Sequence, residues 1–373
     1  MPVPSSLHLL CALTPGMRLM DWQKMKFLKR ELQPYRYHVI RGGKVTFLEC
    51  RPGQTLNLFS GMGVQKVPHW RLLPLWEYIH PFFMRTVDLI KTNQSYRADI
   101  FVRMARRWHK PILLRCGMVY GERVESEFGL TPEIDNYQKK EAWAFRNSTL
   151  CVVPTQELAE WVVNRYQTRA ENIRIVPNFV DTSLFISRVG VASQSGTVIS
   201  VGRLHAIKRF DLLIKACQIA GVSVRIAGEG PEMVNLLNLA RELRVPLELV
   251  GQIDNQKLPE YYASAQVFVI CSLREGHPKA LIEAMSCGRA CVCVDAPGIR
   301  NLVKDGINGL LVEPDPKAIA AAICLLRDNQ DLRQKLGEHA REYVKNNFDI
   351  HHVLEMDADV IDEVYRIYHG CSE

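Results

Sequence analysis

Apolar residues recur along this chain in short runs that alternate with amphipathic stretches. From residue 87 onward, strands are predicted for the runs VDLIKTN, ILLRCG, TLCVV and IRIVPN, and helices for residues 98–108, 136–145 and 157–166. A second alternation predicts the strands TVISVG, VSVRIAG, LELVG, QVFVI, ACVCVD and GLLVE, with helices over 210–220, 231–243, 258–263 and 279–287. Short apolar strands that alternate with amphipathic helices indicate parallel βαβ units. The chain is therefore expected to form two doubly wound α/β domains.

The remaining segments follow this pattern less closely. Strands are predicted over 7–13, 44–48 and 64–67, and helices over 22–32, 73–85, 299–303 and from 316 to the end. Residues 178–196 lose periodicity and end in small polar residues, which indicates a linker. We predict a first domain over 1–178 and a second over 179–349, with a C-terminal helix of about residues 350–373 that packs back on the first domain.

Composition narrows the class of protein. A length of 373 residues suits two domains, and 47% hydrophobic and 23% charged residues are typical of a globular protein. The net charge of +7 (47 basic minus 40 acidic residues) suits an anionic substrate or membrane surface but is too diffuse to indicate nucleic acid. The eleven cysteines have neither disulfide-like nor metal-binding spacing, which indicates a reducing compartment.

No stretch approaches the roughly 20 apolar residues of a membrane span. Basic and aromatic residues gather within the first 110 positions, which predicts peripheral contact with an anionic membrane. We therefore expect a cytoplasmic protein that lies peripherally on the inner face of the membrane.

Polar residues and glycines follow two predicted strands of the second domain directly. The strand at 198–201 leads into GRLHAIKR, and the strand at 223–227 leads into GEGP. Open parallel sheets bind ligands at the carboxyl ends of their strands, where glycines permit close backbone approach and cations bind phosphate. These motifs supply the candidate residues Gly202, Arg203, Lys208, Gly228, Glu229 and Gly230, which together could hold a diphosphate and its sugar.

The stretch 275–283, EGHPKALIE, passes from a buried strand through a polar turn into a helix. Backbone N–H groups at a helix N-terminus favour an anion. Glu283 lies one helical turn inside, close enough to bind a hydroxyl group that accompanies that anion. A phosphate beside a diol indicates a nucleotide or a phosphosugar.

Other motifs are missing from the sequence. There is no G-x-x-x-x-G-K-[ST] loop, no G-x-S-x-G elbow and no H-E-x-x-H pair, and GEGP does not complete G-x-G-x-x-G. These absences argue against an ordinary NTPase and leave only a weak dinucleotide fingerprint.

The motifs GRLHAIKR, IAGEGP, EGHPKALIEAMSCG and GIRNLVKDGINGLLVEPDP resemble, in order and spacing, the retaining glycosyltransferases of family 4. IRIVPNFVDTSLF resembles the segment that links their two domains, and the likeness covers roughly residues 173–347. Glu275 and Glu283 fit the E-x7-E pattern of the family. The resemblance implies a GT-B fold, in which two Rossmann-like doubly wound domains face each other across a cleft. It also implies metal-independent sugar transfer with retention at the anomeric carbon, and no cofactor beyond the nucleotide-sugar donor.

The resemblance implies roles for individual residues. Arg203 and Lys208 would neutralise the donor diphosphate and the charge that develops on the leaving group. Glu275 would face the donor sugar, and Glu283 would hold the ribose hydroxyls. Further donor contacts are implied for Gly202, Gly228, Glu229, Gly230, Gly276, His277, Pro278, Lys279, Ala280 and Leu281.

The N-terminal half departs from the family pattern. Gly16 stands alone where many members have a Gly-Gly loop, and Arg115 follows the central strand where the family often has a histidine. These two residues are the candidates in that domain.

We expect a hexosyltransferase-type enzyme that moves sugar from a nucleotide-sugar to a glycan or lipid-linked acceptor in cell-surface polysaccharide or glycolipid synthesis. A GT-B nucleotide-sugar epimerase would use a similar donor pocket without an acceptor. A non-catalytic nucleotide-sugar-binding subunit is the third interpretation, which the single glycine and the missing histidine leave open. No nucleic acid partner is expected.

Overall fold

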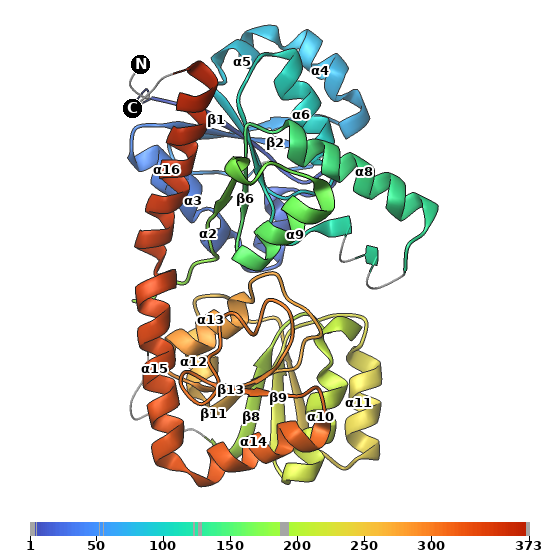
Figure 1. Ribbon diagram of the computed structural model, residues 1–373, viewed down its shortest axis with the longest axis vertical. Helices are drawn as coiled ribbons and strands as arrows, with labels where there is room; N and C mark the ends of the chain where they lie inside the picture. The colour runs from blue at the N-terminus through green and yellow to red at the C-terminus, as the bar shows by residue number, and fades with distance from the viewer. Residues whose placement is uncertain are drawn as a thin grey trace. The chain divides into compact units, whose positions relative to one another are not determined.

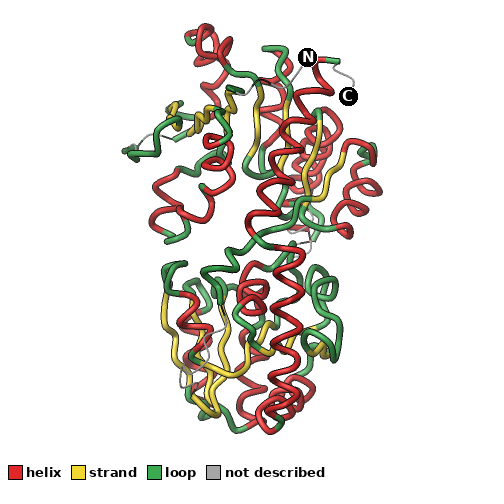
Figure 2. The backbone as a smooth tube through the Cα atoms, turned by 90° about the vertical axis from the view of Figure 1, so that its left-hand side faces the viewer, coloured by secondary structure: helices red, strands yellow, loops and turns green. Residues whose placement is uncertain are grey.

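The computed structural model describes residues 4, 6–51, 53–54, 56–121, 124–125, 129–186 and 194–370. The chain divides into two compact units: Met1–Pro177 with Leu354–Glu373, and Asn178–Val353. Over the described residues, one unit contains a 7-stranded sheet of order β3-β2-β1-β4-β5-β6-β7 and the other a 6-stranded sheet of order β10-β9-β8-β11-β12-β13. The strands of each sheet run side by side with helices flanking them (Figure 1 and Figure 2). All strand pairs are parallel, which confirms the prediction of two doubly wound α/β sheets.

The first unit contains the less regular half of the sequence. Its strands are β1 (His8–Ala12), β2 (Lys44–Glu49), β3 (Met62–Lys66), β4 (Leu89–Thr92), β5 (Ile112–Arg115), β6 (Leu150–Val153) and β7 (Ile173–Ile175). Its helices are α1 (Leu19–Lys24), α2 (Leu28–Glu31), α3 (Gln33–Ile40), η1 (Trp70–Leu72), α4 (Leu73–Ile79), α5 (Pro81–Thr86), α6 (Ala98–Arg107), α8 (Pro132–Asn147), α9 (Gln156–Tyr166) and η2 (Ala170–Asn172). Most of the last helix, α16 (Ile350–His369), also belongs to this unit.

The second unit follows the predicted alternation closely. Its strands are β8 (Gln194–Val201), β9 (Ser223–Ala227), β10 (Leu247–Gly251), β11 (Ala265–Ile270), β12 (Ala290–Val294) and β13 (Leu310–Val312). Its helices are η3 (Ala206–Lys208), α10 (Phe210–Ala220), α11 (Met233–Glu242), α12 (Leu258–Ala263), α13 (Lys279–Ser286), α14 (Pro316–Asp328) and α15 (Gln330–Phe348).

Three predicted helices differ in the structure. The segment 22–32 contains parts of two helices, which are separated at Lys26 because that residue has a left-handed φ of 57°. The segment 73–85 breaks before Pro81, whose ring removes an N–H donor and disfavours helical geometry at the preceding residue. The segment 299–303 forms successive turns and not a helix.

Alternate residues of the central strands in the first unit point to opposite faces of the sheet. Leu10 and Ile90 belong to the main apolar core of this unit. On the other face, Cys11 donates a hydrogen bond from Sγ to the Tyr35 hydroxyl of α3. Lys91 of β4 contacts α16 on the same face. This second face therefore holds polar groups inside the fold.

Lys91 and Asp357 form a buried ion pair between β4 and α16. The Lys91 Nζ lies 2.6 and 2.7 Å from the two carboxylate oxygens, and the side chains are only 1% and 5% exposed. Burial lowers the pKa of Lys91, which the charge of Asp357 opposes. Burial alone would raise the pKa of Asp357, but the nearby Lys91 and Arg115 charges hold it below its ordinary value. The pair fixes α16 to the sheet of the first unit.

Within the described parts of the chain, no helix is both long enough and apolar enough to cross a membrane.

Removal of one member of the Lys91–Asp357 pair should be far more destabilising than removal of both. Asp357→Ala leaves a buried ammonium without its counter-charge, so we expect a loss of about 3–5 kcal/mol in the free energy of unfolding. Urea denaturation followed by circular dichroism measures this loss.

Two further variants complete that test. Asp359→Ala removes a neighbouring exposed carboxylate of α16 and should change stability by less than about 0.5 kcal/mol. Lys91→Met with Asp357→Leu should recover most of the loss, since it removes both buried charges. Equal losses in Asp357→Ala and Asp359→Ala would contradict the interpretation.

Candidate functional site

The carboxyl ends of four strands meet at one edge of the second unit's sheet. Chain order reverses between the neighbours β8 and β11, so this edge contains a topological switch point. The strand-end loops are joined by backbone hydrogen bonds. Leu204 N donates to Glu229 O at 2.9 Å, Leu273 N to Ile207 O at 2.9 Å, and Glu275 N to Pro297 O at 3.0 Å. The four loops therefore form one connected surface.

Glycine permits two of these loops to lie against each other. Gly228 has a φ of +150°, and a Cβ built there would stand 1.9 Å from the Gly202 carbonyl oxygen. A Cβ at Gly230 would stand 2.3 Å from the Leu204 carbonyl oxygen. The sequence predicted close backbone approach at both glycines. In the structure, it is the backbone of the neighbouring loop that approaches them.

Lys208 and Glu275 connect the β8 and β11 ends electrostatically. The Lys208 Nζ lies 2.5 Å from Glu275 Oε1, which also accepts a hydrogen bond of 2.6 Å from the Ser272 hydroxyl. The Glu275 side chain is 8% exposed and that of Lys208 is 21% exposed. Ammonium and carboxylate are thus brought together although 67 positions separate them in the sequence.

The other charged candidates of these loops face solvent. Arg203 and Glu229 are exposed, and in the described portion of the chain the Arg203 side chain forms no ion pair. Arg203 therefore has its guanidinium donors available beside Lys208 on the same loop.

Two side chains that precede α13 in the sequence hold the carboxylate of Glu283. Its side chain is buried, and it accepts hydrogen bonds from the Tyr262 hydroxyl at 3.0 Å and from Asn255 Nδ2 at 3.4 Å. Burial, followed by the adjacent Glu283 charge, raises the pKa of Tyr262. The tyrosine therefore stays protonated and donates to the carboxylate.

The N-terminus of α13 lies between Glu275 and Glu283. Pro278 is its N-cap residue and no side chain caps it. The Leu281 amide donates to Pro278 O at 3.1 Å, and the Leu281 side chain is fully buried. Gly276, Lys279 and Ala280 are half-buried and lie at the opening of this helix.

His277 is buried next to this turn. Its Nδ1 accepts a hydrogen bond of 3.1 Å from the Asn178 amide, and its carbonyl accepts one of 2.7 Å from Asn178 Nδ2. Its ring packs edge-on against Phe348. Burial, with a smaller effect of the Lys279 charge, lowers the pKa of His277 to about 3. His277 is therefore neutral at pH 7 and fixes the turn instead of neutralising an anion.

Several residues of this surface were missed at the sequence level. Ser272 binds Glu275, Tyr262 binds Glu283, and Gly298 lies under the Glu275 backbone. The Pro-Gly pair after the strand ACVCVD was a usable signal for Gly298. Nothing local in the sequence connects Tyr262 with Glu283, since 21 positions separate them.

The two candidates of the first unit lie at the carboxyl ends of different strands. Gly16 follows β1 with a φ of +93°, and Arg115 ends β5, with β4 between these strands. Arg115 Nη1 lies 3.7 Å from Asp357 Oδ1. Arg115 therefore faces the buried Lys91–Asp357 pair.

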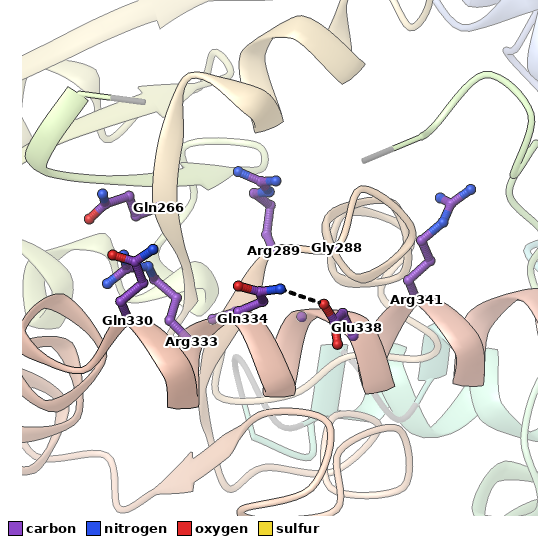
Figure 3. A pocket seen from close by; sticks show the side chains of 10 residues that line it. Gln266, Gly288, Arg289, Gln330, Arg333, Gln334, Glu338 and Arg341 are labelled. Carbon is purple, nitrogen blue, oxygen red and sulfur yellow. Dashed lines mark hydrogen bonds between the residues drawn. The ribbon is translucent and has the colours of Figure 1, made fainter. Parts of the chain in front are cut away.

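A cavity of about 460 Å³ opens at the amino ends of β11 and β12, the opposite end of the second unit's sheet (Figure 3). It is lined by Gln266, Gly288, Arg289, Ala290, Gln330, Arg333, Gln334, Gly337, Glu338 and Arg341. Arg333 and Arg341 donate to backbone carbonyls at the ends of α14 and α13, respectively. These arginines cap helices, and the cavity is separate from the strand-end surface.

The close contact beneath Glu275 gives a stability test. Gly298 has a φ of +77°, and a Cβ there would stand 1.9 Å from the Glu275 carbonyl oxygen. We expect Gly298→Ala to cost at least about 2 kcal/mol more than Gly306→Ala, whose φ of +69° carries the same strain without any atom within 4 Å. Equal losses in chemical denaturation would show that no close contact exists.

His277 gives a pH test. Between its ordinary pKa of 6.5 and its folded value of about 3, the unfolded chain binds a proton at His277 that the native protein does not. Stability should therefore fall as the pH is lowered through this range. In His277→Gln, the loss of unfolding free energy between pH 7 and pH 5 should be smaller than in the parent by about 2 kcal/mol. His351→Gln, at an exposed position, should keep the parent's pH dependence.

Comparison with known proteins places the chain in a family. The family model described as "Glycosyltransferase Family 4" matches residues 33–184, and the one described as "Glycosyl transferases group 1" matches residues 184–343. The chain is 24% identical over 360 residues to a D-inositol 3-phosphate glycosyltransferase of Nocardiopsis dassonvillei, with 85% of this chain and 82% of that protein covered. It is 23% identical over 338 residues to an alpha-1,4-N-acetyl-D-galactosaminyltransferase of Campylobacter jejuni that is named for a PP-undecaprenol glycan, with 86% and 90% covered.

Solved structures agree on the fold. The crystal structure of Anabaena HepE in complex with UDP matches with a TM-score of 0.76 at 18% identity, over 96% of this chain and 100% of that one. Together, the two family models span residues 33–343, which include the whole 6-stranded sheet and the 7-stranded sheet except β1. The chain therefore belongs to glycosyltransferase family 4, the glycosyl transferases group 1, and is a GT-B-fold glycosyltransferase that takes its sugar from a nucleotide-sugar donor.

Proposed function

We propose that the strand-end surface of the second unit binds the nucleotide-sugar, and that the enzyme transfers the sugar with retention to a hydroxyl of a cell-surface glycan or glycolipid precursor. The observation that carries this proposal is the Lys208–Glu275 ion pair, which joins the ends of β8 and β11 at the switch point. It puts a cation and a carboxylate beside the glycine-lined loops, where a diphosphate and a sugar require them.

The donor diphosphate lies in this proposal over the Gly202 and Gly228 loops. Backbone N–H groups of these loops can bind phosphate oxygens, and the opening of α13 offers the positive end of a helix dipole. Arg203 and Lys208 supply the positive charge. The exposed guanidinium of Arg203 can grip two phosphate oxygens at once, while Lys208 acts as a point charge.

Lys208 stabilises the leaving group in the proposed reaction. As the glycosidic bond breaks, negative charge develops on the diphosphate, and a cation already held in place stabilises it without reorganisation. Glu275 keeps Lys208 in position before the donor binds, and Ser272 keeps Glu275 in position. We name no covalent nucleophile, and attack from the same face within an ion pair accounts for retention. The two cations take the role that a metal ion has in other glycosyltransferase classes.

Glu283 binds the ribose hydroxyls in the proposal. Its carboxylate accepts from Tyr262 and Asn255, and a carboxylate oxygen can accept from more than one donor, including the hydroxyls of a diol. Because Tyr262 donates to Glu283 and is itself fully buried, the carboxylate orientation is fixed before the nucleotide arrives.

The acceptor is the least constrained part of the proposal. The PP-undecaprenol glycan in the name of the Campylobacter relative supports a lipid-linked acceptor, and the UDP in the HepE complex supports a uridine nucleotide. Arg115 and Gly16 are the proposed acceptor-side residues of the first unit, at the carboxyl ends of its strands.

The donor site is tested by ligand-dependent thermal stabilisation. UDP-, GDP- and ADP-sugars are compared first, because binding raises the apparent melting temperature by mass action. With the best donor, Glu283→Ala should weaken binding by about 10- to 100-fold through loss of charged hydrogen bonds. Lys208→Ala should lower the rate of donor cleavage by about 100- to 1,000-fold with a smaller effect on binding.

Lys215→Ala is the matched control, because Lys215 is a cation of α10 outside the strand-end loops, with a side chain that is 45% exposed. It should keep the parent's donor affinity and rate. Unchanged affinity in Glu283→Ala and an unchanged rate in Lys208→Ala would refute the site assignment. Chromatography after incubation with donor alone separates the other interpretations: an epimer identifies an epimerase, and tight binding without turnover for any acceptor identifies a binding subunit.

A further inference from the structure

The segment from the end of η1 through α4 and α5 of the first unit presents apolar side chains to solvent. Leu72, Leu75, Tyr78, Ile79 and Phe82 are all at least 45% exposed, and Tyr78 and Phe82 reach 82% and 78%. We refer to these five residues as the outer α4–α5 face. Within α4, Tyr78 and Ile79 lie three and four residues after Leu75 and so share one side of that helix with it, and Leu72 and Phe82 are exposed just before and after it. Contiguous exposed apolar surface of this kind marks a site of association.

The opposite side of the same segment is already used by the core. Leu73, Trp76 and Met84 are buried in the main apolar core of the first unit. Glu77 accepts hydrogen bonds from Arg107 and from the Trp108 indole, and Lys110 Nζ donates to the Arg85 carbonyl. The segment therefore already packs on the first unit through its inner side and is bonded to α6 and the residues after it. The exposed apolar residues are thus not core residues that have lost their packing.

The exposed charges of the segment that carries this face have a single sign. In residues 60–87 and 100–114 the only acidic residue is Glu77, which is 2% exposed and paired with Arg107. Two exposed arginines, Arg71 and Arg85, lie in the same segment as the face, whereas Arg103 and Arg106 lie over the Trp143 ring of α8. The Arg85 guanidinium lies 5.7 Å from the Phe82 ring centroid, so that charge and aromatic surface adjoin. A partner that binds this face should therefore have an apolar interior and a negatively charged surface.

We propose that the outer α4–α5 face docks the protein on an anionic lipid bilayer. Tyr78 and Phe82 insert at the level of the headgroups, Leu72, Leu75 and Ile79 enter the acyl boundary, and the arginines bind lipid phosphates. This inference rests on the proposed function only for its biological purpose. Membrane contact would bring the enzyme to a lipid-linked acceptor.

A second copy of the chain fits this face less well. A two-fold contact would place the same patch on both partners and so bring the arginine rims together. Like charges across an interface oppose association, whereas a lipid surface offers many mobile anions. The charge pattern therefore favours the bilayer over self-association.

Vesicle sedimentation with the full chain tests the proposal. Binding to vesicles of phosphatidylcholine with one quarter phosphatidylglycerol should exceed binding to pure phosphatidylcholine by at least tenfold at low salt. Tyr78→Ser with Phe82→Ser should weaken binding to the anionic vesicles by at least about tenfold. Arg71→Glu with Arg85→Glu should weaken it by about 25-fold or more, at about fivefold for each lost charge.

Val234→Ser with Ile307→Ser is the matched control, since both residues are exposed apolar positions of the second unit. It should bind vesicles like the parent. All variants should keep the parent's donor-induced thermal stabilisation, so failure of membrane binding is distinguishable from failure of the donor site. Equal binding to neutral and anionic vesicles would overturn the proposal. The proposal would also be overturned if neither outer-face variant changed vesicle binding. A dimer in sedimentation velocity that Phe82→Ser converts to monomer would overturn it as well.

Discussion

Close backbone approach at the strand ends is the constraint on which the second unit's functional surface depends. Gly228, Gly230 and Gly298 each stand where a Cβ would meet a carbonyl oxygen of a neighbouring loop at 1.9–2.3 Å. Any other side chain at these positions would push the loops apart. The backbone hydrogen bonds between the loops would then be lost, and with them the positions of the charged residues.

The charges of this surface are arranged by that backbone frame. Lys208 and Glu275 lie on different loops, and their contact exists because Leu273 N donates to Ile207 O between those loops. An ion pair that is only partly buried contributes modestly to stability. Its value for the proposed reaction lies in orientation: the cation is in place before any leaving-group charge develops.

Both units also contain buried polar side chains, and a single substitution at such a side chain should change the stability of its unit. Lys91 and Asp357 remain charged because each neutralises the other, whereas His277 has no counter-charge and stays neutral. The first arrangement fastens α16 to the sheet of the first unit, and the second fixes the turn that leads into α13. Polar residues inside the two units thus act as fixed attachment points, whereas the outer α4–α5 face and Arg203 remain available at the surface.

Local patterns in the sequence determined the parallel α/β class, most strands of both sheets and the motifs at the strand ends, because apolar period and glycine or cation placement are properties of neighbouring residues. The sequence misjudged helix continuity near Lys26 and Pro81, where one backbone angle outweighs a good apolar period. Only the tertiary structure decided which side chains meet. The contacts of Glu283 with Tyr262, Glu275 with Ser272 and Lys91 with Asp357 depend on sheet order and on the return of α16 to the first unit. The Lys91–Asp357 contact spans 266 positions, and no local period encodes a contact over that distance.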